Sequence, residues 1–366
     1  MTRLVLAGDV MTGRGVDQVL PRPLPPQIQE RYVRDARDYV HLAASVNGPV
    51  PAPVPPSWPW GAVLETVEAW RPDAQVMNLE TAVTRAGAAQ PGKAVHYRMS
   101  PENVGCLEVA GTDVWTLANN HVLDYGPAGL EETLATLRGA GQRSAGAGMD
   151  EQAAWRPAAV DLHGGRRLLV WSVADASSGT PASWRAFPKA PGVAVLPELS
   201  LSCADALVAH VHRERRPGDL VLVSVHWGAN WGYRVPADQV RFAHRLVDGG
   251  VDVVHGHSSH HARPMEVHRG RLVLYGCGDL VNDYEGISGY DEYRDDLRLL
   301  YRVDVHPETG ELRDLRMRVF HARRIRLEPA VPEDVSWLAG VLGRESRRFG
   351  CAVTAEGDCL QVSPLA

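Results

Sequence analysis

Six apolar runs in this chain are each followed closely by residues that can bind a metal or transfer a proton. The runs are rich in residues that favour strands, and they cover positions 4–7, 74–77, 112–117, 220–225, 251–254 and 271–275. The polar residues that follow them are Asp9, Glu80, Asn120 with His121 and Asp124, His226, His257 with His260, and Asp279. In open α/β sheets, ligands bind at the carboxyl ends of the strands. The pattern therefore predicts an α/β fold in which the strand ends form one active site.

Helical patterns alternate with these runs and support the α/β class. We expect helices over 61–70, 129–139 and 237–248, where apolar residues recur at helical spacing. After residue 265 the pattern changes to strands joined by turns, at 265–268, 272–275, 297–305 and 312–320, which predicts antiparallel pairing in a mixed sheet. The pattern over residues 333–366 predicts one helix and a last strand. We expect one catalytic domain over 1–330, with residues 331–366 packed on it.

A proline-rich segment interrupts this order at residues 21–60. Ten prolines stand at its two ends, and helical spacing runs between them over 28–44. This pattern indicates a helical insertion held by extended arms. Above the strand ends such an insertion acts either as a lid or substrate wall, or as a passive surface excursion.

Five of the polar residues form a candidate ligand set for a metal. Asp9, Glu80, Asn120, His226 and His257 offer mixed oxygen and nitrogen atoms, which suit one divalent ion such as Mn²⁺, Mg²⁺, Ca²⁺ or Zn²⁺. Each residue alone also has a structural explanation, such as a turn-capping carboxylate or a buried histidine with satisfied hydrogen bonds. The combination favours a metal site. We expect no organic cofactor.

Two histidine–carboxylate pairs are candidates for proton transfer. His121 with Asp124 is the stronger pair, because a neighbouring carboxylate fixes the tautomer of an imidazole and raises its basicity. The alternative for this pair is a helix-capping Asp beside a solvated His. His260 with Asp279 is the second pair, and it depends on an inferred proximity.

Bulk composition excludes several classes of protein. Apolar residues make up 45% of the chain, which fits a soluble globular protein, and the net charge of −6 with a pI near 6.2 argues against nucleic-acid binding. The chain begins almost directly with its first strand, and no apolar run reaches the length of a membrane span. Its five cysteines are scattered and odd in number, which favours a reducing compartment. We therefore expect a cytoplasmic protein that does not bind membranes; the sequence carries no signal for a particular oligomeric state.

The polar motifs together resemble those of the CapA-type poly-γ-glutamate capsule synthesis family. The motifs are Gly8-Asp9-Val10-Met11-x-Gly13-Arg14, Asn78-Leu79-Glu80, Ala118-Asn119-Asn120-His121-x-x-Asp124, His226-Trp227-Gly228 and Gly256-His257-x-x-His260. They occur in the family's order and cover about residues 3–305. The resemblance implies a metallophosphoesterase-like fold, a four-layer α/β/β/α sandwich with two sheets between helices. It also implies that the five ligand candidates face the metal and that His121 is the proton donor.

Three departures from the family's pattern bear on the chemistry. Met11 stands where a dinuclear phosphoesterase usually has a His two residues after its first Asp, and Asn78-Leu79-Glu80 replaces the usual acidic second motif. Both changes argue against a two-metal clamp for phosphoryl displacement. The third departure is the missing export or anchor segment expected of a capsule-synthesis protein.

Two enzymatic functions and one non-enzymatic function fit these residues. The first is a metal-assisted peptide epimerase, since some epimerases of lasso-peptide biosynthesis, a class of ribosomal peptide tailoring, resemble the same family. Epimerisation needs a base on each face of a Cα and a cation near the carboxylate. The second is a CapA-type metal-dependent hydrolase or ligase-type enzyme acting on phosphoester or poly-γ-glutamate substrates. The third is a binding protein with an inactive metal site, which the pair His121 and Asp124 disfavours. The residues narrowly favour the epimerase, with a peptide-like partner.

Overall fold

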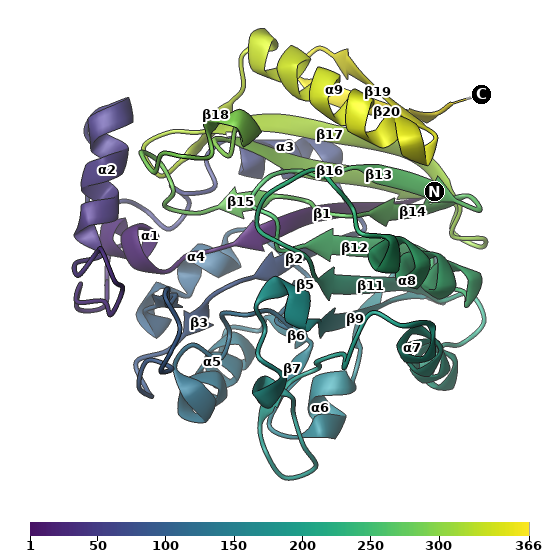
Figure 1. The fold of residues 1–366 in the computed structure, drawn as a ribbon, viewed down its shortest axis with the longest axis horizontal. Coiled ribbons are helices and arrows are strands. Elements are labelled where there is room, and N and C mark those ends of the chain that lie inside the picture. Colours follow the sequence, from purple (N-terminus) through teal and green to yellow (C-terminus); the bar gives the residue numbers. More distant parts are fainter. Residues whose placement is uncertain (366) are drawn as a thin grey trace.

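Two large β-sheets face each other in the computed structural model, which describes residues 1–365 (Figure 1). The first sheet has the order β19-β20-β17-β16-β1-β2-β5-β6, with β15 beside β1 and β18 beside β17. Its strands are β1 (Thr2–Val10), β2 (Ala74–Leu79), β5 (Val114–Thr116), β6 (Arg143–Ala145), β15 (Asp279–Val281), β16 (Leu297–Val305), β17 (Leu312–Ala322), β18 (Leu327–Pro329), β19 (Cys351–Glu356) and β20 (Cys359–Pro364).

The second sheet has the order β13-β14-β12-β11-β9-β8. Its strands are β8 (Ala158–Asp161), β9 (Arg167–Ala174), β11 (Leu220–His226), β12 (Val253–His257), β13 (Met265–His268) and β14 (Arg271–Leu274). Two short pairs complete the strands: β3 (Ala82–Val83) with β4 (Arg98–Met99), and β7 (Ala147–Gly148) with β10 (Gly192–Val193).

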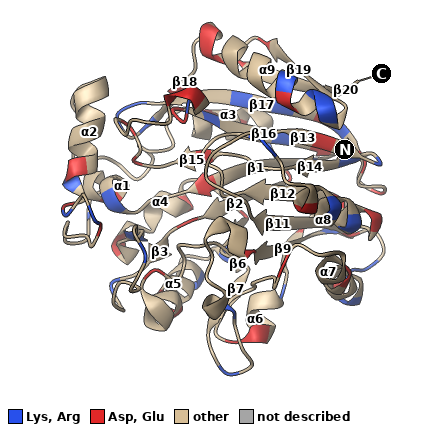
Figure 2. Ribbon diagram, viewed as in Figure 1, with Lys and Arg blue, Asp and Glu red and all other residues tan. Residues whose placement is uncertain are grey.

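Helices cover the outer faces of both sheets. They are α1 (Arg14–Val19), α2 (Arg37–Asn47), α3 (Val63–Trp70), α4 (Gly105–Glu108), α5 (Gly126–Gly139), α6 (Glu151–Trp155), α7 (Leu201–Glu214), α8 (Ala237–Asp248) and α9 (Pro332–Ser346). Helix α9 carries the acidic residues Glu333 and Asp334 in its first turn and Arg344 and Glu345 in its last turn (Figure 2). None of the helices in the described part of the chain combines the length and the hydrophobicity needed to cross a bilayer.

Strand alternation explains why the molecule has four layers. Successive side chains of a strand point to opposite faces, so Leu4 and Leu6 of β1 join the core between the two sheets, and Val5 and Ala7 join the core under α1, α3 and α5. A third core packs the other sheet against α7 and α8. The predicted four-layer α/β/β/α sandwich is confirmed.

Parallel pairing brings the predicted strand ends to one edge of each sheet. In the first sheet β1, β2 and β5 are parallel neighbours, and in the second sheet β11, β12 and β14 are. Asp279 is placed differently from the prediction, because it begins β15 instead of following a strand end. Since β15 runs parallel to β1 with Asp279 opposite Asp9, the carboxylate still reaches the same edge.

The proline-rich segment contains a shorter helix than its spacing predicts. Helix α2 covers Arg37–Asn47, whereas residues 28–34 form a loop in which the Ile28 amide donates to the Arg34 carbonyl. The loop is held because Arg14 forms a buried ion pair with Glu30 and a hydrogen bond to Tyr39 of α2. The buried contacts of Arg14 therefore determine the local backbone structure here more strongly than the helical spacing of the sequence does.

The tail contains one strand more than predicted. After α9, β19 and β20 form a hairpin, and β20 pairs with β17 of the first sheet. Gly357 turns the chain between them with φ +64°, a conformation that glycine adopts readily. Ala366, the last residue of the predicted tail segment, lies outside the described residues.

Candidate metal centre

Asp9, His226 and His257 form the centre of the candidate site. Asp9 lies at the end of β1 in one sheet, and the two histidines end β11 and β12 in the other. All three are fully buried, and one ligand atom from each lies within 4.8 Å of the others. The site is therefore assembled between the two sheets.

The hydrogen bonds around the two histidines direct unprotonated nitrogens toward each other. His257 Nε2 lies 2.7 Å from Ser224 Oγ, and His226 Nε2 lies 3.1 Å from the Asn120 side-chain oxygen. If both Nε2–H groups donate to these oxygens, both Nδ1 atoms carry lone pairs, and the two Nδ1 atoms are 2.8 Å apart. Asp9 Oδ1 lies 3.5 Å from His257 Nδ1. Converging lone pairs beside a carboxylate are the arrangement that a divalent cation binds.

Buried carboxylates exceed the cations available to balance them. Burial and the nearby Asp279 carboxylate raise the pKa of Asp9 to about 7. Burial and Asp9 raise the pKa of Glu80 above its usual range, and Glu80 Oε2 has no hydrogen-bond partner in residues 1–365. Removing acceptors from water without a partner is unfavourable. A bound divalent ion would offset this repulsion, so the residues present fit a metal.

Glu80 and Asn120 approach the centre from the other side of His226. Glu80 Oε1 lies 3.7 Å from His226 Nε2 and 3.8 Å from His121 Nε2. The Asn120 side-chain oxygen is 3.1 Å from the same His226 nitrogen. Asn120 and Glu80 thus lie beside the ring nitrogen of His226 opposite the one that faces His257. The five predicted ligands are neighbours, and their roles as ligands remain predictions.

His121 and Asp124 are in contact, together with a lysine that the sequence analysis did not single out. His121 Nδ1 lies 2.6 Å from Asp124 Oδ2, and the Tyr97 amide donates to the same carboxylate oxygen over 2.7 Å. Lys93 is ion-paired to Asp124 and packs against the Trp184 ring at 4.9 Å. Burial and Lys93 lower the pKa of His121, whereas burial raises the pKa of Asp124 to about 6. The lowered pKa favours the neutral form of the His121 imidazole, whose Nε2 lies 3.8 Å from Glu80 Oε1.

His260 and Asp279 also meet, as the sequence analysis inferred. His260 Nδ1 lies 3.0 Å from Asp279 Oδ1, and Asn282 donates to the other carboxylate oxygen over 2.6 Å. Burial opposes protonation of His260, but Asp279 outweighs it and raises the pKa of this imidazole. His121 and His260 thus have pKa values displaced in opposite directions, an arrangement typical of acid–base sites.

A cavity of about 210 Å³ connects these groups. Its lining includes Glu80, Asn120, His121 and His260 from the predicted set. It also includes residues that sequence reasoning missed: Lys93, Tyr97, Asn230, Ser258 and Tyr284. These lie on loops without a periodic pattern. One signal could have found Lys93, because the chain has only two lysines, Lys93 and Lys189, against a large number of arginines.

The two substituted motif positions have structural explanations. Asn78 donates to Asp9 Oδ1 over 2.7 Å, so it orients the carboxylate, while Glu80 supplies the acidic group two residues later. Met11 is buried, and its amide donates to the Val281 carbonyl over 2.7 Å. Neither residue adds a charged ligand, which favours a single ion over a pair.

Comparison with known proteins shows which family the chain belongs to. Residues 3–284 match the family described as bacterial capsule synthesis protein PGA_cap, a span that includes all nine predicted site residues. A Mycobacterium tuberculosis protein named probable polyglutamine synthesis accessory protein is 49% identical over 365 residues, which cover 99% of this chain and 96% of the relative.

More distant relatives share part of their length with this chain. The PGA biosynthesis protein CapA of Bacillus subtilis is 26% identical over 227 residues, 62% of this chain and 56% of the relative. The capsule biosynthesis protein CapA of Bacillus anthracis is 26% identical over 215 residues, 58% of this chain and 49% of the relative. The match over most of the chain shows that this protein belongs to the PGA_cap family, the CapA-type family that its motifs resemble.

Proposed function

We propose that this protein is a divalent-metal-dependent enzyme that hydrolyses an amide bond in a peptide-like, glutamate-containing polymer by acid–base catalysis. The observation that carries the proposal is the convergence of Asp9, His226 and His257 directly behind a cavity lined by His121 and His260. Ser258, whose amide donates to Asp9, and Asn120, which contacts His226, lie between the two. The proposed metal ligands and the proposed proton-transfer groups therefore lie next to the same cavity.

The chain's own side chains divide the proton transfers between them. A bound divalent cation supplies a Lewis acid that polarises a carbonyl and stabilises negative charge. His121, held through Nδ1 by Asp124, presents Nε2 to accept a proton from an attacking water. His260, held by Asp279, is placed on the same cavity to donate a proton to the leaving nitrogen. Lys93 balances the charge of Asp124 and fixes its position.

The substrate class in this proposal comes from the relatives. The Mycobacterium tuberculosis relative is named for polyglutamine synthesis and the Bacillus subtilis relative for PGA biosynthesis. A glutamate polymer has repeated amide bonds and acidic side chains. The cavity of about 210 Å³ accommodates one residue-sized group of such a polymer, with the remainder outside.

The proposal is tested with oligomers of glutamate in γ and α linkage, incubated with the protein and Mn²⁺. We expect new amino termini to appear, and we expect both chelation and His121→Ala to abolish their appearance. Lys93→Gln should slow this appearance, because it removes the charge that balances Asp124, and Lys189→Gln is its matched control, because Lys189 is the second lysine and is exposed. Cleavage that persists in the His121→Ala protein, or its absence for both linkages with the metal bound, would refute the hydrolase.

Epimerisation at a C-terminal peptide residue is the second candidate. It is favoured by one observation, that two histidine–carboxylate pairs line the same cavity, since epimerisation needs a base on each face of a Cα. Incubation of a glutamate-containing peptide in D₂O distinguishes the two reactions. Deuterium at Cα without a change in covalent connectivity would support epimerisation, and cleavage without deuterium at Cα would support hydrolysis.

We further propose that residues 1–330 form the catalytic domain and that the tail supports it. The proposal is supported by the positions of the site residues, all of which precede residue 300. Within this domain we assign the insertion 21–60 the role of a support behind the cavity wall, since none of its residues lines the cavity itself. Arg14 contacts Glu30 and Tyr39 of the insertion, and its guanidinium lies 4.4 Å from the ring centre of Tyr97, which lines the cavity.

A further inference from the structure

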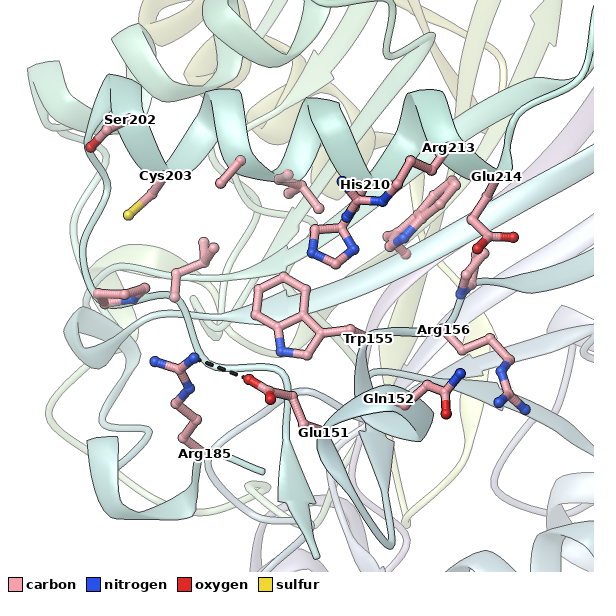
Figure 3. Close-up of a pocket in the computed structure, with 16 residues that line it drawn as sticks. Glu151, Gln152, Trp155, Arg156, Arg185, Ser202, Cys203, His210, Arg213 and Glu214 are labelled. Carbon is pink, nitrogen blue, oxygen red and sulfur yellow. Dashed lines mark hydrogen bonds and ion pairs between the residues drawn. The ribbon is translucent and has the colours of Figure 1, made fainter. Parts of the chain in front are cut away.

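A second, larger cavity lies on the outer face of the six-stranded sheet. It has a volume of about 700 Å³ and lies between α6, α7 and β9, as Figure 3 shows. None of the nine predicted site residues lines it. Its volume is within the range of pockets that bind small molecules, roughly 300–1,000 Å³.

Aromatic rings form much of the wall of this outer cavity. Trp155 of α6 stacks on His210 of α7 with ring centres 5.6 Å apart and planes 24° apart. Figure 3 shows His210 reaching from its helix toward Trp155. Trp171 of β9 and Leu207 of α7 add apolar surface. Stacked, nearly parallel rings beside apolar surface favour a flat ligand.

Two hydrogen-bond donors in the wall lack partners. Trp171 is 2% exposed, and its Nε1 has no acceptor among residues 1–365. The Nε of Arg185 is likewise buried without an acceptor, although the other end of this guanidinium pairs with Glu151 at 3.1 Å. A buried donor without a partner is unfavourable. A small rearrangement of the wall would open these donors to the acceptor oxygens of a ligand.

The charges around the cavity favour an anion. Arg156 and Arg213 are exposed on its lining, and neither takes part in an ion pair within the described chain. Together with Arg185 they outnumber the two acidic residues of the lining, Glu151 and Glu214. Arginine pairs with a carboxylate through two parallel hydrogen bonds.

We propose that the outer cavity binds a small planar aromatic carboxylate. The ring of this ligand packs against Trp155, and its carboxylate lies near Arg156, Arg185 and Arg213 of the lining. The negative charge is balanced by the arginines of the lining. This binding site is separate from the metal centre, because none of the candidate metal ligands lines it.

Calorimetric titration of the whole, chelator-treated protein with naphthoate tests the proposal. We expect saturable binding of one molecule per chain with a Kd below about 1 mM. Naphthalene-methanol, which lacks the charge, and cyclohexane-carboxylate, which lacks the flat ring, should each bind about tenfold more weakly. Because the metal is absent, the result does not depend on the proposed enzyme function.

Variants link the binding to the named residues. Trp155→Ala should weaken naphthoate binding about tenfold or more, and Trp155→Phe should restore most of it by returning a flat ring. Arg156→Gln combined with Arg213→Gln should reduce the preference for the carboxylate over the alcohol. Arg138→Gln on α5 is the control, since Arg138 is exposed and lies outside the cavity. An absence of saturable binding, or equal binding by the wild-type protein and a folded Trp155→Ala protein, would overturn the proposal.

Discussion

Two groups of histidines and carboxylates in the described chain bring their ligand atoms within 4.8 Å of one another, and they differ in burial. The first is Asp9, His226 and His257, which is fully buried between the two sheets. The second is His244, Glu266 and His268, which is half-buried between α8 and β13. Residue types alone do not separate these groups, because each has two imidazoles and a carboxylate.

The two groups differ in the hydrogen-bond partners of their imidazoles. In the second group each imidazole has its own carboxylate, with His244 Nε2 2.9 Å from Glu266 and His268 Nε2 3.1 Å from Asp248. The two rings stack 3.8 Å apart with planes only 6° apart, so their nitrogens do not converge on one point.

In the first group the acceptors exceed the donors. The Nδ1 atoms of His226 and His257 face each other at 2.8 Å beside Asp9, and Glu80 Oε2 nearby has no partner. A surplus of buried acceptors therefore indicates a cation site better than the number of histidines does.

The largest expected effect is on metal content. The protein loaded with Mn²⁺ and dialysed should hold about one ion per chain, and Asp9→Asn should lower the content to background, because a carboxylate ligand becomes a weaker neutral amide. Elemental analysis measures this directly. His244→Ala, from the second group, should leave the metal content unchanged. A loss of metal in the His244→Ala protein, with the metal retained in the Asp9→Asn protein, would show that the second group is the metal site.

Removal of the proton-transfer group should affect activity without affecting metal. His121→Ala should lower the rate of turnover of a glutamate oligomer by about 10²–10⁴-fold, the usual contribution of a general acid or base. Its metal content should match that of the wild-type protein. His268→Ala provides the control from the second group, and a comparable loss of rate there would show that the variants act through general instability.

Residues that orient the ligands should have an intermediate effect. Ser224→Ala removes the oxygen that lies 2.7 Å from His257 Nε2, so the imidazole loses the contact that fixes its tautomer. We expect the affinity for Mn²⁺ to fall by roughly 10- to 100-fold, as for other outer-shell partners. Competition with a fluorescent chelator measures the change. An unchanged affinity would mean that the tautomer is set by another contact.

The smallest effect is expected from the second group. His268→Gln removes a partly exposed pairing with Asp248, and such pairs contribute about 0–1 kcal/mol to stability. Urea unfolding should therefore show a shift within this range, equal with and without Mn²⁺. A shift present only with Mn²⁺ would reveal a metal at this group.

The sequence predicted the positions of the site residues better than it predicted their neighbours. Asp9, His226 and His257 were recognisable because each follows an apolar run, and parallel strands bring their carboxyl ends to one edge. Lys93 and Tyr284 belong to loops whose course depends on tertiary contacts, so no local pattern marked them as part of the cavity.

The same limit applies to parts of the fold. The helix expected over 28–44 begins only at Arg37. Arg14, which lies outside this segment, forms an ion pair with Glu30 and holds the residues around it in a loop. The hairpin of β19 and β20 was predicted as one strand, since its turn at Gly357 is short. Both differences come from contacts or turns that hydrophobic periodicity does not record.

The candidate ligands come from both sheets, Asp9 from one and the two histidines from the other, so an ion bound there would hold the two sheets together. An ion that binds only the folded chain raises the free energy of unfolding. At ion concentrations above Kd, this increase grows with the logarithm of the ion concentration. The lifetime of this protein against proteases should then rise and fall with the supply of that ion. Starvation for the metal would remove the protein itself as well as its activity.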